Sequence, residues 1–492
     1  MLNGLVPAGT PLHVRLTSAV GSYASKPGSP VSAVVIAPVV LRGETLLPAG
    51  SRISGYVKSV SRVGLGIRHE VAGLDLDFDR LTPPDSPSLP LAARVVDVDN
   101  SRERVTPNGR IHGIRATSSL CYRVSRYLRM LLPWEVHAEI AEWAIKSLIA
   151  DLPEPEIYYP QGVELTLALK APLLVNAFGS WPESTERLDG SERAELNSVM
   201  SQLPDQTLDP YSGRPSDLTN FLLLGSRDEI VAAFAAAGWT PPAISFSLRQ
   251  KIKFIRATAE LHGDSTFPML PLSLEGTEAD MSWEKGLNDV SKRHHVRIWR
   301  AGEWRGREVW VGAATRDINF AYLRPGQALT HKIDENIDQE RDKVAYDLAF
   351  TTCSGLLDWI ARPGRPRTAR NGTGDLMLTD GRVAVIGLNS CASPRLATET
   401  GDTETLPPRG GRLQRFVRRE ILCARNDAMR TNLYWRTFEG ARFAVSYLHQ
   451  RRQRTLARDA AQRQPPAEAP VPPPETSPPP SNPGTIEIAV AR

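Results

Sequence analysis

The sequence predicts an α+β multidomain protein: an N-terminal antiparallel β barrel or sandwich, then an α+β domain, then a helical region and a disordered, proline-rich tail. Two observations lead to this order. A repeated proline–glycine turn with alternating apolar residues marks the N-terminal part, and mixed strand and helix patterns replace it further along. The length of 492 residues suits two to four domains, and a hydrophobic content of 41% is enough for packed cores.

The N-terminal part repeats one short phrase three times. PAGT begins at Pro7, PAGS at Pro48, and a looser copy, PQGV, at Pro160. Proline presets φ for a turn and glycine takes the left-handed conformation, so each copy is expected to reverse the chain into a strand. Apolar and polar residues alternate after the first copy, from Leu12 to Leu16, which is typical of a half-buried strand.

Later segments predict a mixture of strands and helices. The stretch NFLLLGSRDEIVAAFAAAGW predicts a buried strand, a turn and a helix closed by Gly238, and its single turn glycine favours a plain βα unit over a phosphate cradle. An Asp-Gly pair at Asp380 predicts a hairpin. The expected divisions are a β-rich domain at 1–175 with an inserted helix near 134–152, a linker at 176–208, an α+β domain at 209–362, a hairpin plus arginine-rich helical region at 363–460, and a disordered tail at 461–492.

Composition and cysteine spacing limit the function classes. The 59 basic and 55 acidic residues nearly balance, which argues against a dedicated nucleic-acid binder. The four cysteines form no CxxC pair, so a zinc finger is excluded; free thiols are favoured, and long-range disulfides remain open. No segment has the apolar length of a membrane span. The first residues do not form a signal peptide, and we expect a leader to be encoded upstream, in frame with Met1.

The stretch RHHVRIWR, residues 293–300, is the main candidate for a site. Because side chains alternate between the faces of a strand, His294 is expected on an apolar face, buried and hydrogen-bonded. His295 is expected on the opposite, cationic face beside Arg293 and Arg297, the two candidate anion-binding residues.

A third histidine and several carboxylates follow in THKIDENIDQERD. A divalent metal such as zinc or manganese would find imidazole and carboxylate ligands there. The candidate ligands are His294, His295, His331, Asp334 and Asp338, with Asp317 as a further choice.

A structural interpretation of the same residues is favoured over the metal site. Acidic residues at a helix start stabilise the helix dipole, Arg341 would pair with Asp338, and His294 would be a satisfied core residue. No HExxH, GxSxG or Walker motif is present, so no catalytic residue is assigned and no cofactor other than a divalent metal is implied.

Four motifs in this order, AAAGW, RHHVRIWR, VWVGAATRD and THKIDENIDQERD, resemble the C-terminal domain of LssY-type proteins over about residues 209–362. In some bacterial proteins of that type this domain sits beside a phosphatidic-acid-phosphatase-type membrane domain, whose helices are absent here. The PAGT and PAGS copies resemble, more weakly, the β-barrel of TrbI-type conjugation-channel proteins. These resemblances imply a cell-envelope or periplasmic location, with the cytoplasm as the alternative, and protein partners in the envelope or in secretion.

Two functions are therefore expected from the sequence. The first is a non-enzymatic envelope protein that acts as an interaction or assembly module. The second is a metal-dependent hydrolase that acts on a phosphate-bearing lipid or envelope substrate. The closing segment TIEIAVAR, from Thr485, alternates like a strand and could add to a sheet edge of a partner, although an inert disordered end is favoured.

Overall fold

The computed structural model describes residues 3–23, 25–41, 44–64, 70–115, 155–176, 186–210, 212–243, 269–289, 291–322, 329–362 and 364–391, together with single positions between 413 and 452. The chain separates into two compact units, Met1–Cys423 and Ala424–Arg492. The first unit contains an N-terminal β region (3–176) and a C-terminal α+β region (186–391). The described positions of the second unit are helical.

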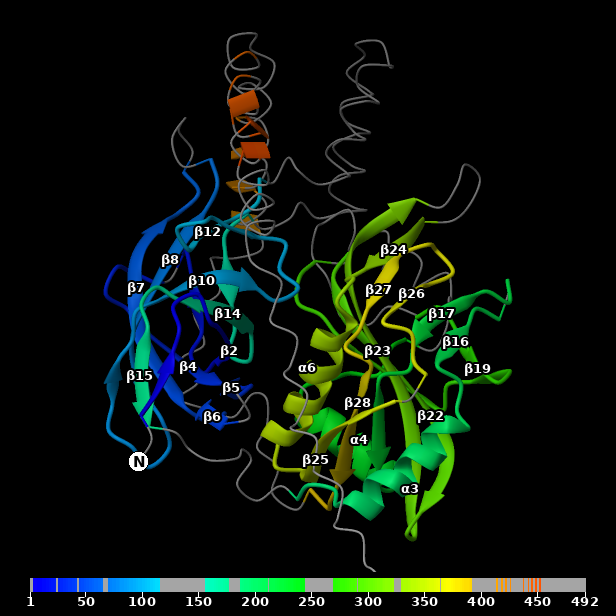
Figure 1. Ribbon diagram of the computed structural model, residues 1–492. Helices are drawn as coiled ribbons and strands as arrows, with labels where there is room; N and C mark the ends of the chain where they lie inside the picture. The colour runs from blue at the N-terminus through cyan, green and yellow to red at the C-terminus, as the bar shows by residue number, and fades with distance from the viewer. Residues whose placement is uncertain are drawn as a thin grey trace, which may run out of the picture. The chain divides into compact units, whose positions relative to one another are not determined.

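The N-terminal β region is built on one nine-stranded sheet in the order β10-β14-β2-β4-β7-β8-β12-β11, with β9 paired to β8. Its neighbouring strands pair antiparallel, and β10 also contacts β8, so the sheet is nearly closed into a barrel (Figure 1). Short ribbons β1–β15, β3–β13 and β5–β6 complete the region. Its strands are β1 (Asn3–Val6), β2 (Pro11–Leu16), β3 (Val20–Gly21), β4 (Pro30–Val35), β5 (Val39–Leu41), β6 (Glu44–Leu47), β7 (Arg52–Ser61), β8 (Gly73–Thr82), β9 (Leu89–Pro90), β10 (Ala93–Val98), β11 (Arg104–Val105), β12 (Arg110–His112), β13 (Tyr158–Tyr159), β14 (Glu164–Leu169) and β15 (Leu173–Asn176).

The three proline–glycine turns behave as predicted. Gly9, Gly50 and Gly162 have φ values of 85°, 88° and 91°, which lie in the left-handed region. The turns lead into β2, β7 and β14, all of which are interior strands of the nine-stranded sheet. The repeated phrase therefore marks the starts of three interior strands of the barrel-like sheet.

The C-terminal α+β region is centred on a mixed seven-stranded sheet in the order β21-β22-β23-β18-β28-β25, with β24 paired to β23. Helices α4 and α6 supply apolar residues to the core on one face, and helix α3 supplies them to the core on the other. A four-stranded sheet, β17-β16-β19-β20, and the ribbon β26–β27 complete the region. Its elements are α3 (Gly190–Ser201), β16 (Gln206–Leu208), β17 (Pro215–Leu218), β18 (Phe221–Leu224), α4 (Arg227–Ala236), β19 (Ser273–Leu274), β20 (Thr277–Glu278), β21 (Met281–Lys285), β22 (Arg293–Trp304), β23 (Arg307–Tyr322), β24 (Leu329–Ile333), α6 (Ile337–Phe350), β25 (Ser354–Ala361), β26 (Thr368–Arg370), β27 (Leu376–Leu378) and β28 (Arg382–Leu388).

The observed layout confirms the predicted fold class: a barrel-like antiparallel sheet first, then an α+β region. The predicted strand–turn–helix unit is β18 followed by α4, and Gly238 has the left-handed φ of 80° expected of a closing glycine. Within the described residues, no helix combines the length and the apolar character needed to cross a membrane.

Three local predictions need correction. The segment predicted to be a linker is folded, since it contains α3 and β16. Leu196 and Met200 of α3 are buried in the core under the central sheet. The strands on either side of Asp380 do not form a hairpin: β27 pairs with β26, whereas β28 lies between β18 and β25.

The preference for free thiols is wrong for one pair of cysteines, since Cys353 and Cys391 form a disulfide. The sequence spacing gave no local signal for it, because 38 positions separate the two residues and only the fold of β25 and β28 brings them together. Cys121 and Cys423 lie outside the described residues, as do the predicted helix at 134–152 and the tail at 461–492.

Candidate functional site

Strand β22 directs its two histidines to opposite faces of the sheet, as the alternation predicts. His294 is 2% exposed, and on its face Val296 and Ile298 enter the core beneath α4 and α6. His295 is 6% exposed and lies in the field of Arg293 and Arg297. The two imidazoles therefore belong to two separate clusters of charged side chains.

The first cluster joins the N-terminal β region to the C-terminal α+β region, and we call it the bridging cluster. A row of three side chains crosses the central sheet, because the register places Lys285, His294 and Arg316 opposite one another on β21, β22 and β23. A second row runs along α6, where Glu340, Lys343 and Asp347 share one face at three- and four-residue spacing. The β region contributes Arg15, Asp99 and Glu164.

His294 lies between a carboxylate of each region. Its Nδ1 is 2.7 Å from an oxygen of Glu340 on α6, and its Nε2 is 2.7 Å from an oxygen of Asp99 in the turn after β10. A neutral imidazole has a single N–H, so donation to both carboxylates requires the protonated ring. Burial lowers the pKa of His294, but Asp99 and Glu340 outweigh it and raise that pKa above its ordinary value.

Two buried carboxylates hold the rest of the bridging cluster together. Glu164 lies opposite Arg15 in the pairing of β14 with β2, at 2.8 Å, and also accepts from Lys285 at 2.7 Å and from Lys343. Asp347 of α6 contacts the same three cations, at 3.3, 3.0 and 3.3 Å. Burial opposes ionisation of Glu164, yet Lys285, Lys343 and Arg15 hold its pKa well below the usual value.

An apolar contact supports these ion pairs. Phe350 at the end of α6 packs with Ile36 and Ala49 of the β region, and the Arg15 guanidinium lies 5.4 Å from the Phe350 ring centroid. The two regions are therefore joined by apolar burial as well as by charge.

The second cluster lies within the C-terminal region and centres on Asp317 of β23. One oxygen of Asp317, Oδ2, lies 3.2 Å from His295 Nε2, 3.0 Å from His331 Nδ1 and 3.6 Å from Arg293 Nε. Burial would raise the pKa of Asp317, but His295, His331 and Arg293 lower it to about 2. For His295 the balance is the opposite: burial holds its pKa well below the ordinary value despite the attraction of Asp317.

The two arginines predicted to bind an anion are held by carboxylates. Arg293 contacts Glu284 at 2.7 Å, and Arg297 donates to Asp217 at 3.0 Å and to the carbonyl of Leu270. The prediction that these two arginines bind a free anion is therefore not supported by their contacts.

The five predicted metal ligands are divided among several places. His294 belongs to the bridging cluster, and His295 and His331 meet at Asp317. Asp334 lies ahead of the helix and accepts from the backbone of Asn336, whereas Asp338 pairs with Arg341 at 3.1 Å, as the structural interpretation expected. Among the described residues, no group of three or more His, Cys, Asp or Glu side chains is arranged to hold a metal ion.

Most members of the bridging cluster were not singled out from the sequence. The spacing of Glu340, Lys343 and Asp347 on one helix face was the available signal. Arg15, Asp99 and Glu164 gave none, because only the fold of the β region brings them to α6.

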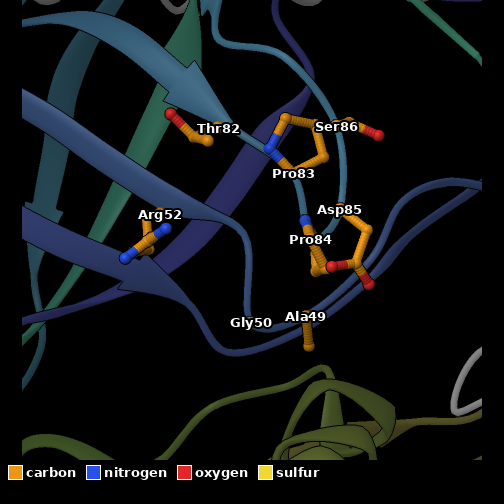
Figure 2. Close-up of a pocket in the computed structure, with 8 residues that line it drawn as sticks. All are labelled: Ala49, Gly50, Arg52, Thr82, Pro83, Pro84, Asp85 and Ser86. Atoms are coloured by element: carbon orange, nitrogen blue, oxygen red, sulfur yellow. The ribbon is translucent and has the colours of Figure 1, made fainter.

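A hollow of about 550 Å³ lies in the N-terminal β region, and none of the residues that line it belongs to either charged cluster (Figure 2). Figure 2 shows Arg52 and Asp85 on different sides of it. The hollow is lined by Ala49, Gly50, Arg52, Thr82, Pro83, Pro84, Asp85 and Ser86. None of these residues was a predicted site residue.

The fold and its buried charges define a β-rich protein with two regions joined by ion pairs. Residues 200–383 match the family model described as the LssY C-terminus, which confirms the resemblance predicted for this part of the chain. Among solved structures, ComB10 of the Com type IV secretion system of Helicobacter pylori is similar at 12% identity with a TM-score of 0.20, over 35% of this chain and 89% of that one. No curated protein sequence matches the chain.

Proposed function

We propose that this protein is an interaction or assembly module of the cell envelope in which the β region and the LssY-type region act as one body. The observation that supports this proposal most strongly is the bridging cluster. His294, the most prominent candidate for chemistry, is occupied on both nitrogens by carboxylates from the two regions. Its role is to hold the regions together.

The energetics of the bridging cluster fit a fixed joint. Removing one partner of a buried ion pair leaves an uncompensated charge and typically costs about 3–5 kcal/mol. Glu164 and Asp347 each contact Arg15, Lys285 and Lys343, so separation of the regions would strand several charges at once. A joint of this kind would present binding surfaces of both regions to partners in a constant arrangement.

The envelope location and the class of partner rest on the LssY-type and TrbI-type resemblances. We expect envelope or secretion-related proteins as partners, and no nucleic acid. Fractionation of the native host, with the full-length protein detected by antibody, tests this location. Recovery with the envelope or periplasm is expected, and recovery with the cytoplasm alone would contradict the proposal.

A metal-dependent hydrolase remains the second candidate, and one observation favours it: His295 and His331 both face the same oxygen of Asp317. Elemental analysis of purified full-length protein separates the two functions. The assembly module predicts no stoichiometric metal, and it predicts that His331→Ala keeps its function in the host. Stoichiometric metal that is lost in His331→Ala would overturn the module and support the hydrolase.

The decisive functional comparison uses two variants in the native host. Glu164→Gln weakens the joint, and His331→Ala alters the Asp317 cluster while leaving the joint intact. We expect loss of partner association and host function with Glu164→Gln and near-normal function with His331→Ala. The reverse pattern, with both proteins present at equal levels, would contradict the assembly function.

A further inference from the structure

Arg365, in the loop between β25 and β26, is a buried cation whose side chain has no hydrogen-bond acceptor among the described residues. Its side chain is among the buried residues, with 6% exposure. Its nitrogens Nε, Nη1 and Nη2 are all buried and have no hydrogen-bond partner within the part of the chain that the structure describes. A guanidinium has five N–H donors and remains charged, so burying it without an acceptor is strongly unfavourable.

The neighbouring arginines show how such a group is normally satisfied. Arg341 pairs with Asp338 and Asp380 at 3.1 and 2.7 Å, and Arg362 pairs with Asp205 at 2.8 Å. The nearby carboxylates are thus already committed to other cations. Burial and the charge of Arg362 lower the pKa of Arg365 to about 10, although Asp205 and Asp338 act in the opposite direction.

We propose that Arg365 anchors a binding site for a phosphate group. The planar guanidinium presents two parallel N–H donors that match two oxygens of a phosphate, and Arg362 adds positive charge beside it. A phosphate is compact and supplies several acceptor oxygens to the buried guanidinium. An acidic segment of another protein is bulkier and would reach the guanidinium less readily. The run RPGRPR, residues 362–367, is the sequence signal that could have indicated this site.

This site is independent of the proposed assembly function. It uses the loop after β25, whereas the joint uses α6, β21 and β22 together with the β region. A phosphate at Arg365 would stabilise the C-terminal region and could come from a free ion, a soluble phosphate ester or a lipid headgroup.

Thermal unfolding of the full-length protein tests the proposal. Inorganic phosphate is added at an ionic strength held constant with sodium chloride. A ligand that binds the folded state raises Tm in a saturable way, and we expect a rise of a few degrees for the wild type. Arg365→Met should be at least as stable as the wild type in chloride, because it removes an unpaired buried charge, and it should not respond to phosphate.

Further variants keep the test interpretable. If Arg365→Met does not fold, Arg365→Lys takes its place in the test. This variant keeps the charge but loses the planar fork, so it should bind phosphate at least tenfold more weakly than the wild type does. Arg80→Met, on the exposed face of β8, is the matched control and should respond as the wild type does. Glycerol 3-phosphate and vesicles of phosphatidic acid or phosphatidylcholine distinguish a soluble ester from a lipid headgroup.

Binding of inorganic phosphate, glycerol 3-phosphate or phosphatidic acid that is weakened in the Arg365 variants supports the site. The inference is overturned if the wild type responds to none of these phosphates, or if Arg365→Met and Arg365→Lys respond as the wild type does.

Discussion

The bridging cluster and the Asp317 cluster each contain one of two adjacent histidines of β22, and the pKa values of these histidines shift in opposite directions. His294 has a carboxylate on each ring nitrogen and a raised pKa, whereas His295 shares the single carboxylate of Asp317 with His331 and Arg293 and has a lowered pKa. Both are almost fully buried. Burial lowers the pKa of both rings, and the outcome differs because Asp99 and Glu340 together outweigh burial at His294, whereas Asp317 alone does not outweigh it at His295.

The position of the two clusters adds a second difference. The bridging cluster contains residues from both regions of the first compact unit, and the Asp317 cluster lies wholly within the C-terminal region. Substitutions in the bridging cluster should therefore weaken the contact between the two regions, whereas substitutions in the Asp317 cluster should affect only the C-terminal region.

The largest effect is expected from Glu164→Gln. This change removes the charge that Arg15, Lys285 and Lys343 share, and it should lower the free energy of unfolding by about 3–5 kcal/mol. Urea unfolding of the full-length protein measures it. Arg300→Gln, which alters an exposed ion pair with Glu303 and Glu308, is the control and should change stability by less than about 1 kcal/mol. Equal effects of the two variants would show that the bridging cluster contributes no more than a surface pair.

A smaller effect is expected from Asp317→Asn. Arg293 retains its 2.7 Å contact with Glu284, so the variant should lose about 1–3 kcal/mol of stability. The same urea experiment measures this loss. A larger loss than that of Glu164→Gln would reverse the order that the comparison predicts.

Much of this architecture could be predicted from the sequence, for identifiable reasons. The left-handed glycines at Gly9, Gly50 and Gly162 and the alternation through RHHVRIWR depend on local physics, and both are confirmed. The pairing of Asp338 with Arg341 is confirmed for the same reason, since three-residue spacing on a helix brings them together.

The parts that could not be predicted depend on contacts between distant segments. Arg15 and Asp347 are 332 positions apart, and no local pattern links them. The strand β28 follows an Asp-Gly turn but enters the centre of the sheet beside β18, which the hairpin pattern could not reveal. Arg365 differs again: its sequence signal was present, but it becomes a site candidate only because it is buried and meets no acceptor in the part of the chain that the structure describes.

The pH dependence of stability should have opposite signs at the two histidines. The folded-state pKa of His294 is raised, so its contribution is fully present below its unfolded pKa of about 6.5 and is lost as pH rises through the higher folded value. The stability difference between wild type and His294→Asn should therefore shrink as pH rises above neutrality. Urea unfolding across this range measures it, and a difference that grows with pH would contradict the protonated bridge.

For His295 the pH dependence of stability has the opposite sign, and this is the smallest effect that we expect. Its folded-state pKa is lowered, so its contribution is present above about pH 6.5 and is lost as pH falls toward the folded value. The wild type should lose stability relative to His295→Asn between neutral pH and about pH 5. Titration of the two imidazoles by NMR is an independent check: His294 should stay protonated, and His295 neutral, near pH 6.5. Identical titration of both rings would remove the distinction.

The central claim, that ion pairs across the joint hold the two regions together, is tested most directly by a double-mutant cycle between Arg15 and Asp347. The full-length wild type, Arg15→Met, Asp347→Asn and the double variant are compared by urea unfolding. These two side chains belong to different regions and lie 3.3 Å apart, so the cycle should give a coupling energy of about 1–3 kcal/mol. Additive effects, with a coupling below about 0.5 kcal/mol, would contradict the claim that this charge pair joins the regions.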